Sequence, residues 1–285
     1  MILHKYQALG NDFLILDCIN YQENEELLKS ANFLDFAKEK SDRRRIGCDQ
    51  FIVIENATIN DAKIVFYNSD GSKAEACGNG TVAAGVYVGG FLGKKQVTLE
   101  TDSGLANVEV DGNQATIELP MPKASILEDR EKVDILNAVG YTLKVMNVNV
   151  GNPHCVLTKS MDITPAQLII DIAENHWQEI GETIANMTHI FPYKTNVEFV
   201  TQLHTNIFQV YVWERGAGRT FACGTGACAV AFAMVKQGVA DISKPIEILM
   251  EGSNIYGNGE PIIIKFGENS VFLTNHAFFE GKIEV

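Results

Sequence analysis

Alternating apolar and polar positions predict several β-hairpins in this chain. Residues 105–119 (LANVEVDGNQATIEL) alternate on both sides of Asp111-Gly112, a dipeptide typical of tight hairpin turns. Residues 261–275 (PIIIKFGENSVFLTN) show a similar pattern around Gly267-Glu268-Asn269. Each segment therefore predicts two antiparallel strands that are adjacent in the sequence.

Apolar positions recur at helical spacing in two other stretches, residues 23–40 and residues 164–187. Both stretches therefore predict helices. A further helix of small residues is expected directly after each of two cysteines, Cys77 and Cys223. Strands before and after these helices indicate a mixed α/β fold.

The two cysteines belong to an internal repeat. Ala-Cys-Gly-x-Gly occurs at Cys77 and again at Cys223, at an offset of 223 − 77 = 146 residues. Asn68 precedes the first cysteine by 9 residues, and Glu214 precedes the second by the same 9. A β-rich stretch comes before each motif, and a strand follows each helix. The chain is therefore predicted to be a duplication of one α/β unit.

The predicted fold class is α/β (α+β), with two pseudo-symmetric domains. Each domain is expected to be a mostly antiparallel β-sheet or barrel wrapped around a central helix. The boundary is placed near residues 118–125 (ELPMPKAS), where two prolines follow a predicted strand. The expected domains are residues 1–121 and residues 122–273.

Charge and hydropathy exclude several classes of function. A net charge of −13 and a pI near 4.9 argue against a nucleic-acid partner, because phosphate binding requires clustered Lys and Arg. No apolar stretch reaches the roughly 18 to 20 residues of a membrane span. The N-terminus lacks the pattern of a secretory signal, so a cytoplasmic location is expected.

Two of the six cysteines are candidates for chemistry. Sparse cysteines in a cytoplasmic chain are expected to stay reduced, so a special one is a nucleophile, a base or a metal ligand. No Cys-x-x-Cys pair or nearby His cluster supports a metal site. At a helix N-terminus, unpaired backbone N–H groups are expected to lower the pKa of Cys77 and Cys223. The other four cysteines are interpreted as small buried residues: Cys18, Cys48, Cys155 and Cys228.

Two opposed thiols suggest a specific reaction. If one thiolate removes a proton from a carbon and the other thiol protonates the opposite face, the stereocentre inverts without a cofactor. The glycines also fit the relaxed dinucleotide pattern Gly-x-Gly-x-x-Ala, but that pattern alone is weak. Here a long Gly-containing loop, residues 214–223, separates the strand from the second motif, which disfavours nucleotide binding.

These motifs resemble the diaminopimelate epimerase family, which uses two cysteines and no pyridoxal phosphate. The resemblance extends over almost the whole chain. The matching segments are HKYQALGNDFLILD, DRRRIGCDQ, YNSDGSKAEACGNG, GNPHCV, TNVEFV and ERGAGRTFACGTGACA. The wider superfamily includes proline and histidine racemases, and the last five segments together point to diaminopimelate.

The resemblance implies an epimerase that interconverts LL- and meso-diaminopimelate in lysine and peptidoglycan precursor synthesis. Cys77 and Cys223 would be the acid/base residues, in an active site between the halves, with His154 and Glu214 tuning them. It implies neither cofactor nor metal, a possible homodimer, and return of the C-terminal strand, residues 274–285, to the first domain. The implied substrate contacts are Asn11, Gln50, Asn68, Asn152, Asn196, Glu214 and Arg215, with backbone groups of Gly78, Asn79, Gly224 and Thr225.

Physical reasoning supports part of this assignment. Diaminopimelate carries a second carboxylate, and Arg215 is suited to form a bidentate pair with it. Three departures from the family pattern concern specificity: Thr81-Val82-Ala83 lacks an Arg, Arg219 replaces a Glu, and Cys48 replaces an Ala. The open alternatives are a two-cysteine racemase of histidine, proline or glutamate, and a non-catalytic amino-acid-binding or thiol redox protein.

Overall fold

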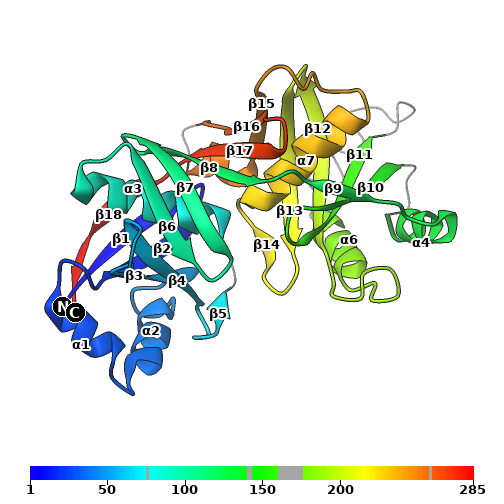
Figure 1. The fold of residues 1–285 in the computed structure, drawn as a ribbon. Coiled ribbons are helices and arrows are strands. Elements are labelled where there is room, and N and C mark those ends of the chain that lie inside the picture. The colour runs from blue at the N-terminus through cyan, green and yellow to red at the C-terminus, as the bar shows by residue number, and fades with distance from the viewer. Residues whose placement is uncertain (75–76, 140–142, 160–175, 257–258) are drawn as a thin grey trace. The chain divides into compact units, whose positions relative to one another are not determined.

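The computed structural model describes residues 1–74, 77–139, 143–159, 176–256 and 259–285. The contacts between Cα atoms divide the chain into two compact units (Figure 1). The first unit consists of Met1–Glu118 and Thr274–Val285, and the second of Leu119–Leu273.

The first unit is a set of strands around one long helix. Its elements are β1 (Ile2–Ala8), β2 (Asn11–Asp17), α1 (Gln22–Leu28), α2 (Phe33–Ser41), β3 (Gln50–Glu55), β4 (Ala62–Asn68), β5 (Lys73–Ala74), α3 (Gly78–Leu92), β6 (Gln96–Thr101), β7 (Gly104–Asp111), β8 (Gln114–Pro120) and β18 (Phe278–Glu284). The C-terminal strand β18 pairs antiparallel with β1, with Ile2 opposite Glu284.

The second unit has the same kinds of elements. These are β9 (Lys123–Ser125), α4 (Asp129–Val139), β10 (Leu143–Asn149), β11 (Pro153–Lys159), α6 (His176–Ala185), β12 (Asn196–His204), β13 (Ile207–Glu214), β14 (Gly218–Thr220), α7 (Gly224–Lys236), β15 (Ile246–Met250), α8 (Glu251–Ile255), β16 (Ile262–Phe266) and β17 (Ser270–His276). The strands β8 and β17 each run across the division between the units.

Strand pairing repeats from one unit to the other. In the first unit, β1–β2, β3–β4, β4–β5 and β6–β7 are antiparallel, whereas β2–β3 and β4–β6 are parallel. In the second unit, β10–β11, β12–β13, β13–β14 and β15–β16 are antiparallel, whereas β11–β12 and β13–β15 are parallel. The two units therefore share one topology, in which α3 and α7 occupy equivalent crossovers.

The crossover helices are the centres of their units. Residues 79–89 of α3 and residues 226–234 of α7 are buried, so each helix is covered on nearly all sides. Small residues make this possible: a Cβ on Gly85 would lie 2.5 Å from Cγ1 of Val108 on β7. A central helix within strands is the predicted arrangement, and the predicted α/β (α+β) fold class is confirmed.

The local predictions have mixed outcomes. The first predicted hairpin is confirmed, with Asp111 opposite Gln114 across the β7–β8 turn. The second gives strands β16 and β17, joined by a turn in which Gly267 N–H donates to the carbonyl of Ser270 at 2.9 Å.

The helical structure predicted over residues 23–40 is confirmed, as two helices. The chain forms α1 and α2, because residues 29–32 turn, and the Ser30 hydroxyl accepts from the Asn32 N–H at 3.3 Å. Of the helix predicted over residues 164–187, α6 covers the later part, and residues 164–175 lie outside the described residues.

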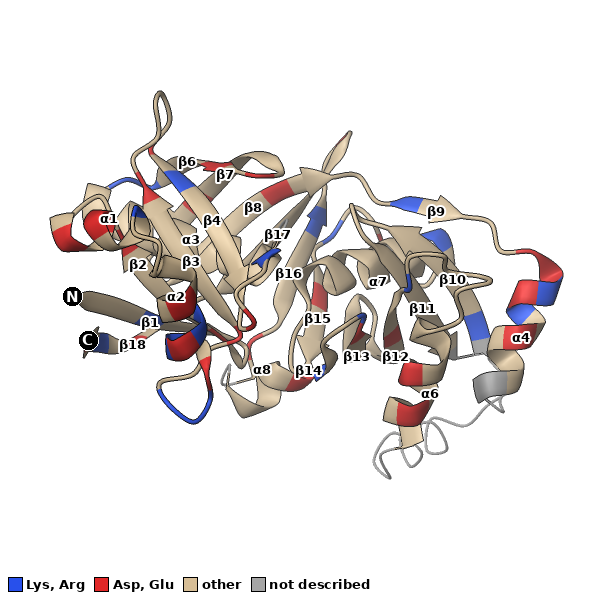
Figure 2. Ribbon diagram, turned by 90° about the horizontal axis from the view of Figure 1, so that it is seen from below, with Lys and Arg blue, Asp and Glu red and all other residues tan. Residues whose placement is uncertain are grey.

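Acidic side chains are prominent on the outer helices. Asp and Glu residues recur along α1, α4 and α6 (Figure 2). This distribution agrees with the net charge of −13. Within the described part of the chain, no helix is long and apolar enough to cross a membrane.

Candidate active site

Each motif cysteine caps the N-terminus of its central helix. Cys77 precedes α3 with φ −143° and ψ 113°, and Cys223 precedes α7 with φ −133° and ψ 112°. The Gly80 N–H donates to Sγ of Cys77 at 3.2 Å, and the Gly226 N–H donates to Sγ of Cys223 at 3.4 Å. Sulfur thus takes the place of the oxygen that usually caps a helix, in a position that favours negative charge.

The second glycine of each motif has little room for a side chain. A Cβ on Gly80 would lie 2.8 Å from a ring carbon of Phe66 and 3.3 Å from Sγ of Cys77. A Cβ on Gly226 would lie 3.0 Å from Oε1 of Glu198 and 3.4 Å from Sγ of Cys223. Glycine at these positions therefore allows the sulfur to reach the helix N–H groups.

In the first unit, Asn11 faces the thiol of Cys77. The distance from Oδ1 of Asn11 to Sγ is 4.0 Å. The Asn11 Nδ2 donates to Oδ2 of Asp49 at 2.9 Å, which directs its carbonyl oxygen towards the sulfur. Asp49 therefore sets the orientation of a predicted substrate contact.

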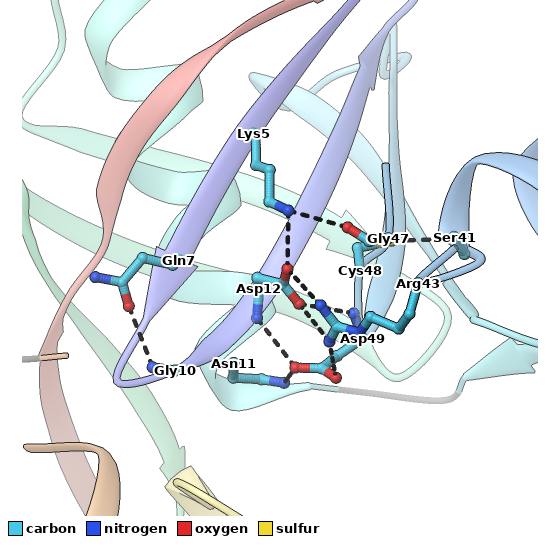
Figure 3. Close-up of polar contacts among 10 residues, drawn as sticks. All are labelled: Lys5, Gln7, Gly10, Asn11, Asp12, Ser41, Arg43, Gly47, Cys48 and Asp49. Atoms are coloured by element: carbon cyan, nitrogen blue, oxygen red, sulfur yellow. Dashed lines mark hydrogen bonds and ion pairs between the residues drawn. The ribbon is translucent and has the colours of Figure 1, made fainter. Parts of the chain in front are cut away.

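A network of charged side chains contacts Asp12 and Asp49 (Figure 3). The Arg43 guanidinium donates to both carboxylate oxygens of Asp12 at 2.8 Å and to Asp49 at 2.6 Å. Lys5 donates to the Gly47 carbonyl at 3.0 Å, and its Nζ lies 3.1 Å from Asp12. Burial opposes ionisation of Asp12, but the hydrogen bonds from Arg43 and Lys5 outweigh it and lower its pKa.

Two hydrogen-bonded pairs of amide side chains also lie in the first unit. Gln50 and Asn68 are opposite each other on β3 and β4, and Nε2 of Gln50 donates to Oδ1 of Asn68 at 3.4 Å. Oε1 of Gln50 is buried without a hydrogen-bond partner among the described residues. Asn79 is buried, and its Oδ1 accepts from Nδ2 of Asn275 at 3.0 Å. Buried polar atoms nearly always have a hydrogen-bond partner, so Oε1 of Gln50 is a candidate acceptor for a ligand.

In the second unit, Thr225 and Asn152 lie beside Cys223. Oγ1 of Thr225 is 3.5 Å from Sγ of Cys223, and it accepts from Nδ2 of Asn152 at 3.3 Å. The Oδ1 of Asn152 lies 3.0 Å from Nε2 of His154. These three predicted residues therefore form one hydrogen-bonded group that ends at the thiol.

Two carboxylates surround Cys223. Burial, followed by the charges of Glu214 and Glu198, raises its pKa well above the ordinary cysteine value and outweighs the hydrogen bonds from Thr225 and Gly226. The expectation that the helix N-terminus lowers this pKa is therefore wrong for Cys223. The thiol of Cys223 is buried.

The pKa of Glu214 is also shifted. Burial raises the pKa of its carboxyl group, although part of the residue keeps contact with solvent. The Thr220 hydroxyl donates to its Oε1 at 2.6 Å. A carboxylate with a raised pKa close to a thiol is typical of an acid/base site.

Asn196 and Arg215 contact each other. The Arg215 N–H donates to Oδ1 of Asn196 at 2.9 Å, and its guanidinium donates to the Tyr193 carbonyl at 3.1 Å. Nδ2 of Asn196 is buried without a hydrogen-bond partner in the described residues. Arg215 is exposed and retains further donors, so both side chains remain able to bind a ligand.

Sequence reasoning missed Glu198, Asp49, Arg43 and Asn275. Glu198 is fully buried, and its Oε1 lies 2.5 Å from Nδ1 of His154. Glu198 follows Asn196 by two positions on β12, and this alternation places both side chains on one face. The position of Glu198 beside Asn196 could therefore have been predicted from the TNVEFV segment.

The departures from the family pattern have structural partners. Arg219 forms an ion pair with Glu251, and its guanidinium lies 5.6 Å from the ring centre of Phe221. Val82 and Ala83 are fully buried in α3. Cys48 is buried, and its Sγ lies 3.3 Å from the Ser41 hydroxyl. These three substitutions therefore have structural contacts within their own units.

The predicted site residues form two sets, one in each unit. The first unit contains Cys77 with Asn11, Gln50, Asn68, Gly78 and Asn79, and the second contains Cys223 with Asn152, His154, Asn196, Glu214, Arg215, Gly224 and Thr225. Across the described ranges, no group of three or more His, Cys, Asp or Glu residues has the arrangement of a metal site.

Comparison with known proteins also finds two similar halves in the chain. The family model for diaminopimelate epimerase matches residues 3–127 and again residues 146–270. A diaminopimelate epimerase of Carboxydothermus hydrogenoformans is 35% identical over 284 residues, covering 96% of this chain and 95% of the relative. One of Acetivibrio thermocellus is 33% identical over 301 residues, covering 99% and 98%.

Solved structures show the same fold at low sequence identity. A phenazine biosynthesis protein of the PhzF family from Bacillus anthracis has a TM-score of 0.71 at 14% identity, covering 100% of this chain and 98% of that chain. A predicted epimerase from Pseudomonas aeruginosa has a TM-score of 0.67 at 13% identity, with the same coverage. With near full-length relatives above 30% identity and a family model matched in both halves, this chain belongs to the diaminopimelate epimerase family.

Proposed function

We propose that this protein is an isomerase that interconverts LL- and meso-diaminopimelate without a cofactor, in lysine and peptidoglycan precursor synthesis. The observation that carries the proposal is the repeated cysteine cap: Cys77 and Cys223 each sit at the N-terminus of a central helix, with a glycine N–H on the sulfur. Membership of the diaminopimelate epimerase family gives the substrate class.

The proposed chemistry is a two-base proton transfer at the α-carbon. One sulfur, as thiolate, removes the α-proton, and the other, as thiol, delivers a proton to the opposite face. The raised pKa of Cys223 supports a role as the thiol that donates first, with Cys77 as the base. In the reverse direction the two sulfurs exchange these roles.

The surrounding groups have proposed roles in binding. The N–H groups at the start of α3 and α7, including those of Gly78, Asn79, Gly224 and Thr225, are suited to hold the substrate carboxylate next to the reacting carbon. Arg215 is proposed to bind the distal carboxylate. Acceptors for the substrate ammonium groups are proposed from Asn11, Gln50, Asn68, Asn152, Asn196 and Glu214.

We further propose that residues 1–121 with 274–285 and residues 122–273 are the two catalytic domains. A cytoplasmic location is also proposed, and a homodimer is proposed on the resemblance alone. The alternative amino-acid substrates histidine, proline and glutamate are less favoured, because the relatives that cover nearly the whole chain are diaminopimelate epimerases. A binding protein without catalysis would not explain the buried titratable groups around Cys223.

The test is proton NMR of LL-diaminopimelate in deuterium oxide with protein and reductant. Loss of the α-proton signal with appearance of the meso isomer is expected, and parallel samples of histidine, proline and glutamate should not exchange. Cys77→Ala and Cys223→Ala should abolish inversion, whereas Cys228→Ala, which changes a buried cysteine of α7, should retain it. Inversion by either active-site variant would contradict the two-base mechanism. Exchange of the α-proton of histidine, proline or glutamate, without exchange of diaminopimelate, would mean that the substrate is a different amino acid.

A further inference from the structure

Glu198 is a buried carboxylate that the proposed reaction does not use. It is completely buried on β12, and Oε1 lies 2.5 Å from Nδ1 of His154. Its Oε2 has no hydrogen-bond partner in the described part of the chain. A buried carboxylate is costly to retain, so its contact with His154 requires an explanation.

The hydrogen bonds of Asn152 determine where His154 carries a proton. Nδ2 of Asn152 donates to Oγ1 of Thr225 at 3.3 Å, so the other end of the amide, Oδ1, faces the histidine. This oxygen lies 3.0 Å from Nε2 of His154. Because a carbonyl oxygen only accepts, Nε2 must carry a hydrogen.

The opposite side of the ring also needs a proton. Nδ1 of His154 and Oε1 of Glu198 are 2.5 Å apart, a separation that requires a hydrogen between them. With one proton on Nε2 and one shared with Glu198, the His154–Glu198 pair has no net charge.

The chain of hydrogen bonds ends at the sulfur. Oγ1 of Thr225 accepts from Asn152, so its own hydrogen is available for Sγ of Cys223, 3.5 Å away. A hydroxyl that donates to sulfur stabilises the thiolate that forms when Cys223 gives up its proton. The direction of each hydrogen bond from His154 to the sulfur follows from the hydrogen on Nε2 of His154.

We propose that Glu198 is a positioning residue for Cys223: through His154 and Asn152 it turns the Thr225 hydroxyl so that it donates to the thiolate. This inference rests on the proposed function in one respect, the role of Cys223 as an acid/base residue. Gly226 is part of the arrangement, because a Cβ there would lie 3.0 Å from Oε1 of Glu198.

The first test reads the proton on His154 directly, without any substrate. In protein labelled with nitrogen-15 at histidine, the His154 signals are assigned by their absence in His154→Asn and recorded near pH 8. The expected result is a protonated Nε2 in the wild type and in Glu198→Gln, whose amide N–H can donate to Nδ1. A wild-type His154 protonated only on Nδ1 would reverse the chain and overturn the proposal.

The second test measures kinetics on diaminopimelate. Glu198→Gln should keep kcat within about threefold, because the isostere preserves the directions of the hydrogen bonds. Glu198→Leu should lower kcat by about ten- to a hundredfold with KM changed less than about threefold, since the loss falls on the proton-transfer step. Glu182→Gln on the exposed face of α6 is the matched control and should behave as wild type.

The outcomes separate this inference from the proposed function. An equal loss of kcat in the Gln and Leu variants, or full activity of the Leu variant, would overturn the role of Glu198. If Glu198→Leu fails to fold, the nitrogen-15 signals and Glu198→Gln still decide. If the wild type does not exchange the α-proton of diaminopimelate, the proposed function fails, while the protonation of His154 still tests the hydrogen-bond chain.

Discussion

The N–H of Gly80 donates to Sγ of Cys77 from 3.2 Å, and the space that this approach requires leaves no volume for a methyl group at Gly80. The nearest atom to a Cβ there is a ring carbon of Phe66, at 2.8 Å. The same helix contains Gly90, whose Cβ position has nothing within 4 Å. The two glycines therefore differ in packing while sharing one helix.

Gly80→Ala and Gly90→Ala should change stability in opposite directions. The first should destabilise the protein by about 1 to 3 kcal/mol, because the methyl group displaces Phe66 or the helix start, and it should lower kcat by moving the N–H away from the sulfur. The second should stabilise it by up to about 1 kcal/mol, because alanine is the better helix former. Urea unfolding measures both, and equal effects of the two substitutions would contradict the packing argument.

A second prediction concerns the Arg43 network. Arg43→Gln should lower the free energy of unfolding at pH 7 by about 1 kcal/mol, a modest value because the guanidinium is partly exposed. The pKa of Asp12 is lowered in the folded protein, so this stabilisation is present above its unfolded pKa of about 3.9 and is lost as pH falls through the folded value. The difference between variant and wild type should therefore shrink below about pH 4.

The control for this prediction is Arg44→Gln. Arg44 is highly exposed and pairs with Asp42 on the same loop. We expect no measurable change in the free energy of unfolding at either pH, because exposed ion pairs contribute little. A loss equal to that of Arg43→Gln would mean that the net charge of the loop matters and the contacts with Asp12 and Asp49 do not.

Local sequence predicted the features that depend on neighbouring residues. The turn at Asp111-Gly112 and the helices that begin after Cys77 and Cys223 follow from residues within a few positions of each other. Apolar spacing also predicted helical structure over residues 23–40, but the short turn near Ser30 that divides it into two helices was not predicted.

The missed site residues depend on contacts between distant positions. Asn275 meets Asn79 across 196 residues, and no periodicity in the sequence encodes that pairing. Glu198 could have been placed on the face of Asn196 by alternation, but its contact with His154 requires the parallel register of β11 and β12. The expected low pKa of Cys223 failed for a related reason: helix N–H groups are local, whereas the burial and carboxylates that outweigh them are not.

The third prediction is that Glu214→Gln is more stable but less active than the wild type. The pKa of Glu214 is raised by burial, so its favourable contribution to stability is complete below its unfolded pKa of about 4.3 and is lost as pH rises through the folded value. At pH 8, above the unfolded pKa, burial of this carboxyl group is therefore a cost. Glu214→Gln should raise the free energy of unfolding there by about 1 kcal/mol, because the amide is neutral and its oxygen can still accept from Thr220.

The same variant should lower kcat, because Glu214 is a proposed substrate contact and its charge acts on Cys223. Thermal unfolding and the NMR exchange assay measure the two effects. Glu182→Gln, an exposed substitution, should change neither. A less stable Glu214→Gln would mean that the carboxylate has favourable partners that outweigh its burial.

The last prediction concerns alkaline pH and the buried thiol of Cys228. Burial raises its pKa to about 12, whereas an unfolded cysteine ionises near 8.5. Its contribution to stability is therefore complete below about pH 8.5 and is lost as pH rises towards 12. Between about pH 9 and 10.5, the free energy of unfolding of the wild type should fall more steeply than that of Cys228→Ala, by about 1.4 kcal/mol for each step of one in pH.

Urea unfolding with reductant at several pH values gives this comparison. Between about pH 6 and 7, the difference between Cys228→Ala and the wild type should be constant, because Cys228 stays protonated there in both the folded and the unfolded chain. Other groups that titrate above about pH 9 are common to both proteins and cancel in the difference. Curves that stay parallel up to about pH 10.5 would show that Cys228 ionises in the folded protein as readily as in the unfolded chain, and so would contradict its burial in α7.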